Sequence, residues 1–443
     1  MRVLEDASLK SLAAALAQLD AEFPTLPALP PISPADTARM TAVLREVAAR
    51  LADNYPYFHP LYAGQMLKPP HPVARAAYAL AMWINPNNHA LDGGRASSRM
   101  ETEAVAELAR IFGFPQHLGH LTSGGTFANL EALWVAAKLA PGKKIVASTQ
   151  AHYTHSRICS VLGIEFSSID STADGCISIA SLKAALAAGG IGTVVATLGT
   201  TATGAVDALD EILALRRQYG FRLHVDAAYG GYFTLAENIS PKVRAAFDAI
   251  SQADSVVVDP HKHGLQPYGC GCILFSDPTV GRFYKHDSPY TYFTSGEISL
   301  ECSRPGASAT ALWATQQMLP MSRGGEFAQG LDAGLSAAQE LHARLASDPH
   351  FVVPAAPQLD IVIWTVHAAD VAASSAAARR LFVVAAGNGL HLALADLPVD
   401  FFPQGTWPAS AQTVTCLRSV LMKPEHLQWL DRIWFLLQAS LSG

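Results

Sequence analysis

The stretch "VVVDPHKHGLQPYGCG", Val256–Gly271, places a lysine shortly after a run of β-branched residues. Three consecutive valines are typical of a strand that is buried on both faces of a sheet. Lys262 lies just beyond this predicted strand, between His261 and His263. A buried ammonium group costs free energy unless it is paired or has lost its charge. The sequence therefore predicts that Lys262 has a chemical role at a strand end.

The bulk composition restricts the class of protein. The chain has 443 residues, and half of them are hydrophobic, which is enough for one large or two medium-sized cores. A formal net charge of −6 argues against a surface that binds nucleic acid or anionic membranes. No signal-peptide pattern is present, and no uncharged apolar run approaches the ~20 residues of a spanning helix. We therefore expect a soluble, cytoplasmic protein.

The six cysteines do not indicate a metal site. They are scattered along the chain, and Cys270 and Cys272 are too close together for the usual spacing of zinc ligands. Scattered cysteines in a long chain are typical of free thiols in a reducing compartment. We interpret the Cys270–Cys272 pair as small residues that fill a strand, and we expect no metal.

Short apolar segments alternate with helical segments in the middle of the chain. The predicted strands are 143–149, 192–199, 221–228 and 255–261. Helical patterns such as 182–188 and 208–219 lie between them. Strands that are apolar throughout and alternate with helices indicate a parallel sheet with helices on both faces.

The two ends of the chain have different patterns. The first ~55 residues look helical, with a proline-rich interruption at 23–34. Near the other end, 359–367 and 413–422 look like antiparallel strands beside helices. We therefore expect an α/β protein with a large, mainly parallel sheet and a smaller C-terminal α+β domain. The expected divisions are a helical N-terminal segment 1–56, a large domain 57–305 and a small domain 306–443.

Chemically useful side chains gather where the predicted strands end, which is where open α/β sheets bind ligands. Asp226 and His152 lie at or just after two of these strand ends, and Thr200 and Thr201 follow a third. The turn "TSGGT", 122–126, precedes a helical run, and the free amides of a helix N-terminus suit a phosphate group. Each feature alone has a common structural explanation, such as a helix N-cap for Asp226.

Together, these residues are the parts that a site for pyridoxal 5′-phosphate (PLP) requires. Lys262 would bond covalently to the cofactor aldehyde, and Asp226 would pair with the pyridine nitrogen and keep it protonated. His152 would stack on one face of the ring, and the small Ala228 would let the other face approach the sheet. The candidates for holding the phosphate are Gly125, Thr126, Thr201 and His261.

The motifs "HVDAAYGG" at 224–231 and "DPHK" at 259–262 closely resemble those of the group II PLP-dependent amino acid decarboxylases. That family includes glutamate and aromatic amino acid decarboxylases, and sphingosine-1-phosphate lyase is a relative. "TSGGTFAN" at 122–129 resembles the phosphate loop of the family, and "QAH" at 150–152 resembles its ring-stacking segment. The resemblance extends from about Tyr57 to the end of the chain. It implies a fold-type-I, PLP-dependent transferase-like fold.

The resemblance also implies roles for particular residues and an assembly. Lys262, Asp226 and His152 match the family's cofactor and catalytic positions, and His59 and Gln65 lie in a segment that resembles its substrate side. The family's usual proton donor to Cα is a tyrosine from the neighbouring subunit. Tyr290 comes nearest to that position, and Tyr292 is the alternative. The family implies a homodimer with active sites at the interface and an N-terminal segment packed on the partner.

We therefore expect the protein to decarboxylate an L-amino acid to its amine and CO₂. The aromatic residues of 54–62 favour an aromatic substrate. A carbon–carbon lyase of the sphingosine-phosphate type remains open, because it would use the same residues to break the Cα–Cβ bond. A catalytically silent cofactor-binding protein is disfavoured, because both Lys262 and Asp226 are present. His263 departs from the bulky apolar residue often found after the family lysine.

Overall fold

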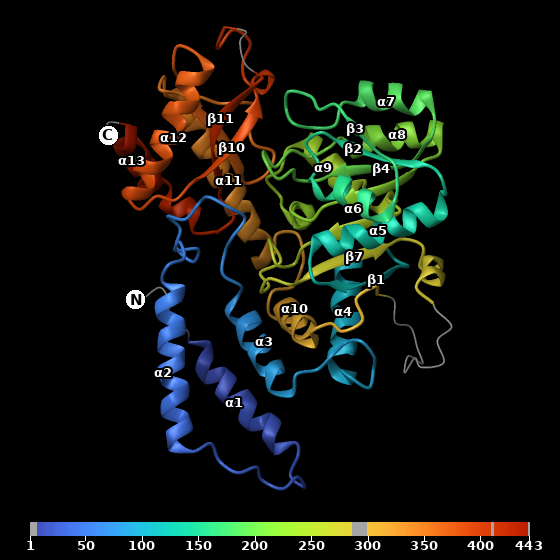
Figure 1. Ribbon diagram of the computed structural model, residues 1–443, viewed down its shortest axis with the longest axis vertical. Coiled ribbons are helices and arrows are strands. Elements are labelled where there is room, and N and C mark those ends of the chain that lie inside the picture. Colours follow the sequence, from blue (N-terminus) through green and yellow to red (C-terminus); the bar gives the residue numbers. More distant parts are fainter. Residues whose placement is uncertain (1–6, 286–298, 409–411, 442–443) are drawn as a thin grey trace.

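The computed structural model of the chain describes residues 7–285, 299–408 and 412–441 (Figure 1). A seven-stranded sheet with helices on both faces forms the larger body. A four-stranded sheet with its own helices forms the C-terminal part, and two N-terminal helices extend away from both.

The seven-stranded sheet confirms the predicted, mainly parallel sheet. Its strand order is β1-β7-β6-β5-β4-β2-β3. Only β7 runs antiparallel to its neighbours, β1 and β6. The strands are β1 (Leu118–Thr122), β2 (Lys144–Ser148), β3 (Phe166–Ile169), β4 (Ile191–Thr197), β5 (Arg222–Asp226), β6 (Ser255–Val258) and β7 (Gly271–Phe275). Cys272 fills β7 as a buried small residue, as the sequence indicates.

Apolar side chains explain why this sheet is covered on both faces. Val256 and Val257 on β6 point to opposite faces and belong to different hydrophobic clusters, and both are fully buried. Burying such a side chain contributes roughly 1.5–3 kcal/mol. The helices of the larger body are α3 (Pro72–Ile84), α4 (Arg95–Ile111), α5 (Gly125–Leu139), α6 (Thr154–Leu162), α7 (Ile179–Ala188), α8 (Leu209–Tyr219), α9 (Pro241–Asp248) and α10 (Gly306–Met318), with 3₁₀ turns η1 (Gly231–Leu235), η2 (Ile250–Gln252) and η3 (Pro278–Phe283).

The smaller sheet has the order β10-β11-β9-β8, and its strands are antiparallel, as predicted for 359–367 and 413–422. The strands are β8 (Phe351–Val352), β9 (Ile361–Val366), β10 (Ala393–Pro398) and β11 (Thr413–Val420); the helices are α11 (Glu326–Ser347), α12 (Val371–Gly387), the 3₁₀ turn η4 (Val399–Phe401) and α13 (His426–Leu441). Ala63 joins this part of the molecule, because its amide donates to the His391 carbonyl at 2.9 Å and its carbonyl accepts from Val420 at 2.8 Å.

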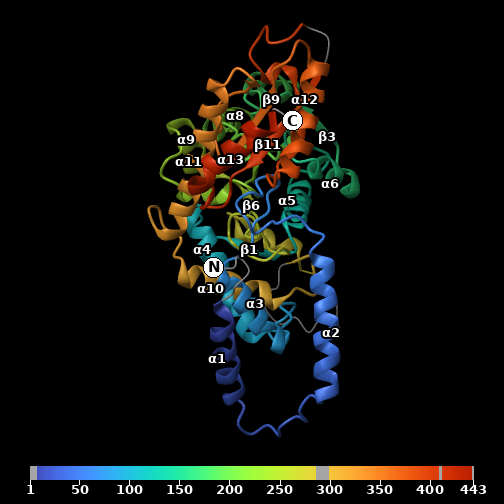
Figure 2. The ribbon, with the colours of Figure 1, turned by 90° about the vertical axis from the view of Figure 1, so that its left-hand side faces the viewer.

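The N-terminal helices α1 (Ser8–Ala21) and α2 (Pro34–Leu51) have no buried residue. Helix α2 begins with proline at its first position, and the Ser33 hydroxyl caps it by accepting the Asp36 amide hydrogen at 3.0 Å. Figure 2 shows both helices extending beyond the body, with α1 in contact with α3. Within the described ranges, no helix is long and apolar enough to cross a membrane.

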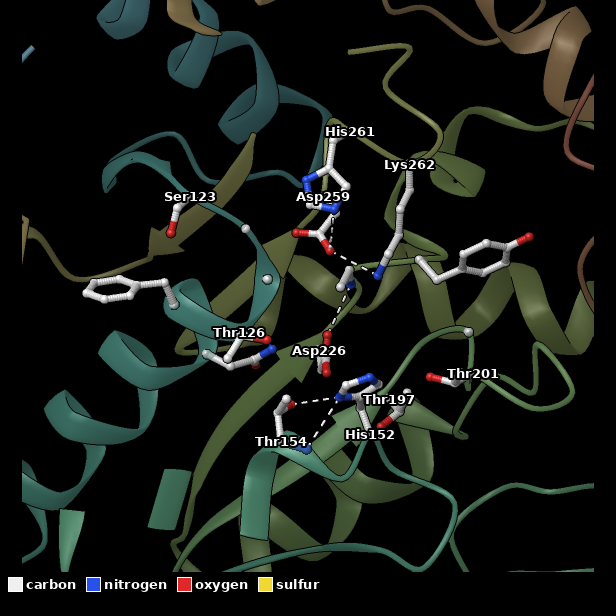
Figure 3. A pocket seen from close by; sticks show the side chains of 17 residues that line it. Ser123, Thr126, His152, Thr154, Thr197, Thr201, Asp226, Asp259, His261 and Lys262 are labelled. Carbon is white, nitrogen blue, oxygen red and sulfur yellow. Dashed lines mark hydrogen bonds and ion pairs between the residues drawn. The ribbon is translucent and has the colours of Figure 1, made fainter. Parts of the chain in front are cut away.

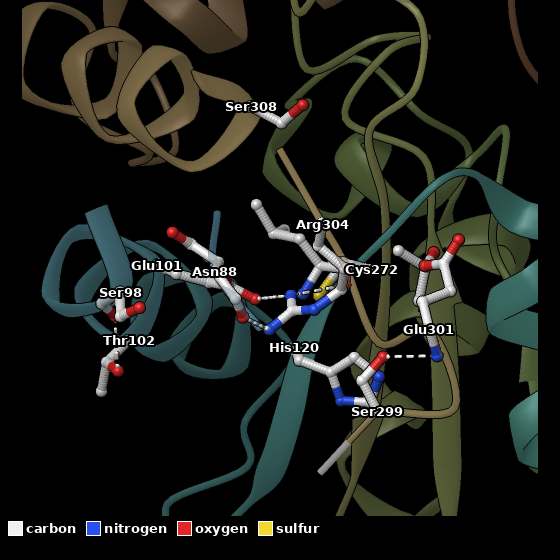
Figure 4. Close-up of polar contacts among 12 residues, drawn as sticks. Asn88, Ser98, Glu101, Thr102, His120, Cys272, Ser299, Glu301, Arg304 and Ser308 are labelled. Atoms are coloured by element: carbon white, nitrogen blue, oxygen red, sulfur yellow. Dashed lines mark hydrogen bonds and ion pairs between the residues drawn. The ribbon is translucent and has the colours of Figure 1, made fainter. Parts of the chain in front are cut away.

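A buried ion pair fixes the chain where it enters α10. Arg304, in the "SRPG" motif, pairs with the Glu101 carboxylate from α4 (Figure 4). Its guanidinium also donates to the carbonyls of Leu121 at 3.0 Å and Asn88 at 2.9 Å. Arg304 therefore joins α4, β1 and the start of α10, which gives this motif a structural role.

Candidate active site

A cavity of about 430 Å³ opens at the carboxyl ends of β4, β5 and β6 (Figure 3). This volume lies in the range of small-molecule and cofactor sites. Every residue that the sequence predicts to contact the cofactor lines it: Gly125, Thr126, His152, Thr201, Asp226, Ala228, His261 and Lys262. Residues that the sequence reasoning missed also line it, among them Thr197, Tyr229 and Asp259.

Lys262 lies at the wall of this cavity with its charge paired. Its Nζ is 2.9 Å from Oδ2 of Asp259, whose side chain is almost completely buried. The other oxygen, Oδ1, has no hydrogen-bond partner among the described residues. Asp259 ends the strand segment one residue before Pro260, three residues before the lysine. The three-residue separation of Asp259 and Lys262 in the sequence is the pattern from which Asp259 could have been predicted as the partner of the lysine.

Asp226 ends β5 and is buried beneath the cavity. Its Oδ1 accepts the Ala228 amide hydrogen at 3.1 Å, and its Oδ2 lies 2.9 Å from His155 Nε2. Burial alone would raise the pKa of Asp226, but the hydrogen bond and charge of His155, with smaller contributions from His224 and Lys262, hold this pKa well below its usual value. Asp226 is therefore an anion at neutral pH, suited to pairing with a cationic ring nitrogen.

His152 lies on the opposite side of Asp226 from Lys262 (Figure 3). Its Nδ1 is 2.9 Å from the Thr154 hydroxyl and accepts the Thr154 amide hydrogen at 3.3 Å. Burial lowers the pKa of His152, so the ring is neutral at pH 7. A flat, neutral imidazole held at one nitrogen is suited to stacking on an aromatic ring.

The turn before α5 forms a cradle for an anion. Gly124 has a φ of +150°, which side-chain-bearing residues rarely adopt. A Cβ atom on Gly125 would lie 2.7 Å from Asp259 Oδ2, so only glycine fits beside that carboxylate. The unpaired amides at the start of α5 face the cavity, with Thr126 in the first turn.

These features fit PLP. The cavity brings together a lysine, an ionised aspartate, a neutral histidine and an anion cradle. The buried hydroxyl of Thr197 and Asp259 Oδ1 lack partners within the described part of the chain, and buried polar atoms of this kind are usually satisfied. A polar ligand in the cavity would supply those partners.

The predicted substrate residues lie outside the cavity wall. His59 packs against Trp429, with 4.8 Å between the ring centroids. Gln65 is exposed, and its Oε1 accepts from Arg418 at 3.3 Å. Arg418 also donates to the Thr201 carbonyl at 2.7 Å, which connects Gln65 to the cavity wall. The roles of His59 and Gln65 stay predictions. Tyr290 and Tyr292 lie outside the described residues.

His263 places a buried imidazole beside a carboxylate of the C-terminal part, and neither ring nitrogen has a hydrogen-bond partner among the described residues. It is buried between the rings of Tyr229 and Phe233, with centroid distances of 4.8 and 5.0 Å. Its Nε2 lies 3.3 Å from Oδ2 of Asp360, which precedes β9 of the smaller sheet. Asp360 also accepts the hydroxyl hydrogen of Tyr229. The residue after Lys262, where this chain departs from the family pattern, therefore lies against Asp360 of the C-terminal part.

The fold and this cavity define a fold-type-I PLP enzyme. The family model of the pyridoxal-dependent decarboxylase conserved domain matches residues 45–367. The chain belongs to the pyridoxal-dependent decarboxylase family, and it is a PLP-dependent carboxy-lyase that acts on amino acids. This result confirms the resemblance found in the sequence and favours the decarboxylase over the carbon–carbon lyase.

Individual relatives agree with this family. The chain is 30% identical to L-tyrosine decarboxylase of Enterococcus faecium, covering 71% of this chain and 68% of that protein. It is 29% identical to the probable L-tyrosine/L-aspartate decarboxylase of Methanothermobacter thermautotrophicus, covering 57% and 69%. The crystal structure of Oryza sativa TDC with PLP and tryptamine superposes with a TM-score of 0.78 at 18% identity, covering 100% and 99% of the two chains. That likeness confirms the fold class.

Proposed function

We propose that this amino acid decarboxylase acts on an aromatic L-amino acid, with L-tyrosine as the first candidate. The observation that carries the proposal is the charge of the cavity wall. Among its described residues, Lys262 is the sole lysine or arginine, and burial lowers the pKa values of both His152 and His261. Phe127 and Tyr229 add aromatic surface. Relatives named for tyrosine support the same substrate class.

We assign each residue a role that its position supports. Lys262 would hold the cofactor and exchange protons at Nζ, and Asp259, 2.9 Å away, would pair with that amine whenever it is free and charged. Asp226 would hold positive charge at the ring nitrogen, and His152 would cover one ring face. Gly125, Thr126, Thr201 and His261 would hold the phosphate. Bound PLP supplies the sink for the electron pair that is left when the Cα–carboxylate bond breaks.

Reprotonation at Cα needs an acid beside that carbon. We keep Tyr290 as the proposed donor, with Tyr292 as the alternative, from the resemblance to the family. A phenol suits the task because a positioned general acid is typically worth ~10²–10⁴-fold in rate.

The substrate proposal predicts strong discrimination between aromatic and acidic amino acids. We expect kcat/KM for L-tyrosine to exceed that for L-aspartate by at least about 10²-fold, because an unpaired buried carboxylate costs ~3–5 kcal/mol. Released CO₂ and product amine should be measured for a panel of L-amino acids offered to the PLP-loaded enzyme. Phe127→Arg, which places a cation at the cavity wall, should lower the ratio of kcat/KM for L-tyrosine to kcat/KM for L-aspartate.

Two results of this panel would overturn the proposal. A higher kcat/KM for L-aspartate than for every aromatic substrate would assign the enzyme to acidic amino acids. Aldehyde without CO₂ from every substrate would indicate cleavage of the Cα–Cβ bond, as in the lyase alternative.

We further propose a homodimer in which the N-terminal helices pack on the partner. Helix α2 exposes Val43, Leu44 and Val47 at 58%, 59% and 43% of their surfaces. The linker before it exposes Leu29 and Ile32. An apolar surface of this kind on two extended helices marks a protein-binding site, and a second copy of the chain is the partner that the family resemblance implies.

The dimer proposal predicts that charges on α2 weaken association. Val43 and Val47 are four residues apart and lie on one face of the helix. The double variant Val43→Asp/Val47→Asp should weaken dimerisation by at least about 10²-fold, because each carboxylate would be buried without a partner. Light scattering after size exclusion should show twice the chain mass for the wild-type protein and for Arg45→Ala, which changes an exposed polar residue of α2. A wild-type protein of single-chain mass at micromolar concentration would contradict the proposal.

We also propose a cytoplasmic location. All six cysteines are free thiols, and five of them are buried. Free cysteines without disulfide bonds are typical of proteins from a reducing compartment.

A further inference from the structure

Two histidines near Asp226 come from one short segment, His152 just before α6 and His155 within it. His152 lies in the cavity, and His155 lies in the first turn of α6, with its amide 3.2 Å from the His152 carbonyl. His155 has no exposed surface. Its Nε2 is 2.9 Å from Asp226 Oδ2. His155 therefore contacts the carboxylate from within the protein, on the side away from the ligand.

The other groups around Asp226 are engaged elsewhere. His224, two residues earlier on β5, uses its two ring nitrogens for Asn129 at 2.8 Å and Ser255 at 2.9 Å. The Lys262 ammonium pairs with Asp259. In the described part of the chain, His155 is the one titratable side chain that hydrogen-bonds the Asp226 carboxylate.

The contacts of His155 place a hydrogen on Nε2. Nδ1 of His155 is buried and has no partner among the described residues. The Asp226 carboxylate accepts hydrogen bonds only, so the ring nitrogen that faces it must carry a hydrogen. The proton therefore lies on Nε2, where it is donated to Asp226 Oδ2.

We propose that His155 is a positioning residue for decarboxylation: its Nε2–H fixes the Asp226 carboxylate in orientation and keeps it ionised toward the pyridine nitrogen of the cofactor. The Ala228 amide holds Oδ1 and His155 holds Oδ2, so each oxygen keeps a lone pair for the ligand. The inference rests on the proposed pairing of Asp226 with that nitrogen.

Loss of the His155 donor has a specific consequence. A buried carboxylate without a donor tends to take up a proton, and a neutral acid does not stabilise a protonated ring. The cofactor would then bind less tightly and would be a weaker electron sink. Because His155 does not line the cavity, substrate contacts, and with them KM, should change little.

The test compares His155→Phe, which removes the donor, with His155→Gln, which keeps an N–H near the position of Nε2. Cys159→Ala is the matched control: this buried residue is one turn along α6 and packs among apolar side chains. For each variant, the PLP dissociation constant, the pH dependence of the visible cofactor absorbance, kcat and KM should be measured, with circular dichroism to verify folding. Asp226→Asn is measured in parallel.

We expect His155→Phe to weaken PLP binding and to lower kcat, each by about 10- to 100-fold, since a hydrogen bond to a charged group is worth ~1.5–3 kcal/mol. The midpoint of the absorbance change with pH should move, and KM should stay within about threefold of the wild-type value. His155→Gln should recover most of both losses, and Cys159→Ala should keep the wild-type kcat and absorbance.

A folded His155→Phe with wild-type PLP affinity and kcat would overturn the inference, as would a His155→Gln no better than His155→Phe. If His155→Phe does not fold, His155→Asn replaces it, because its shorter amide stops near the position of Nδ1. Equal activity of the Asn and Gln variants then overturns the inference. Normal PLP binding and kcat in Asp226→Asn would instead overturn the proposed role of Asp226.

Discussion

Lys262→Ala is expected to abolish the covalent attachment of PLP and to lower activity by at least about 10³-fold. Loss of one positioned general acid or base alone costs ~10²–10⁴-fold, and this variant also loses the bond that holds the cofactor. Borohydride reduction of the PLP-loaded protein followed by peptide mass spectrometry should find the cofactor on Lys262 in the wild-type enzyme and on no residue of the variant. Weak, non-covalent PLP binding should remain, because Asp226 and the phosphate cradle are intact.

The matched control is Lys183→Ala, which removes an exposed lysine on α7. It should keep full labelling and activity. A covalent label that persists in Lys262→Ala at the same yield would show that another lysine holds the cofactor.

Asp226→Asn is expected to keep weak PLP binding and to lower kcat by about 10²–10³-fold, the range found when an electrostatic partner of a developing charge is removed. Asparagine has the same shape, and its amide oxygen can accept the His155 hydrogen bond, so the change removes the charge and the acceptor that faces the Ala228 amide. An unprotonated ring is a poor electron sink. Steady-state kinetics at saturating PLP, with amine product measured directly, separates this loss from incomplete loading.

Asp210→Asn on α8 is the control for this change, because Asp210 is exposed and does not line the cavity. Its kcat should equal the wild-type value. A kcat near the wild-type value in Asp226→Asn would contradict the proposal that this carboxylate pairs with the ring nitrogen of the cofactor.

The residues that line the cavity were predictable because their signals are local. Lys262 and Asp226 each stand at the end of a valine-containing buried strand, and such strand ends in a parallel sheet meet at one edge. The glycine turn before α5 is equally local, since φ at Gly124 and the space beside Gly125 exclude larger residues. The sheet was predictable because strands buried on both faces are apolar throughout.

Contacts between segments distant in the sequence were not predictable in this way. The position of β7, antiparallel between β1 and β6, depends on packing across the whole sheet. The roles predicted for His59 and Gln65 stay predictions, but their contacts with Trp429 and Arg418 could not be read from the sequence. The part played by such side chains depends on which distant segment lies beside them.

The sequence alone therefore determined the enzyme class, the cofactor and the residues at the strand ends, because each of these depends on residue type and on spacing within one strand–turn unit. Only the tertiary structure decided which side chains support them. His155 shares a sequence segment with His152, but its bond to Asp226 forms only because α6 packs over the end of β5. His263 likewise meets Asp360 only because the two sheets lie side by side. A buried charge without a partner costs free energy, so burial makes these contacts necessary for stability. Burial itself is a property of the folded chain.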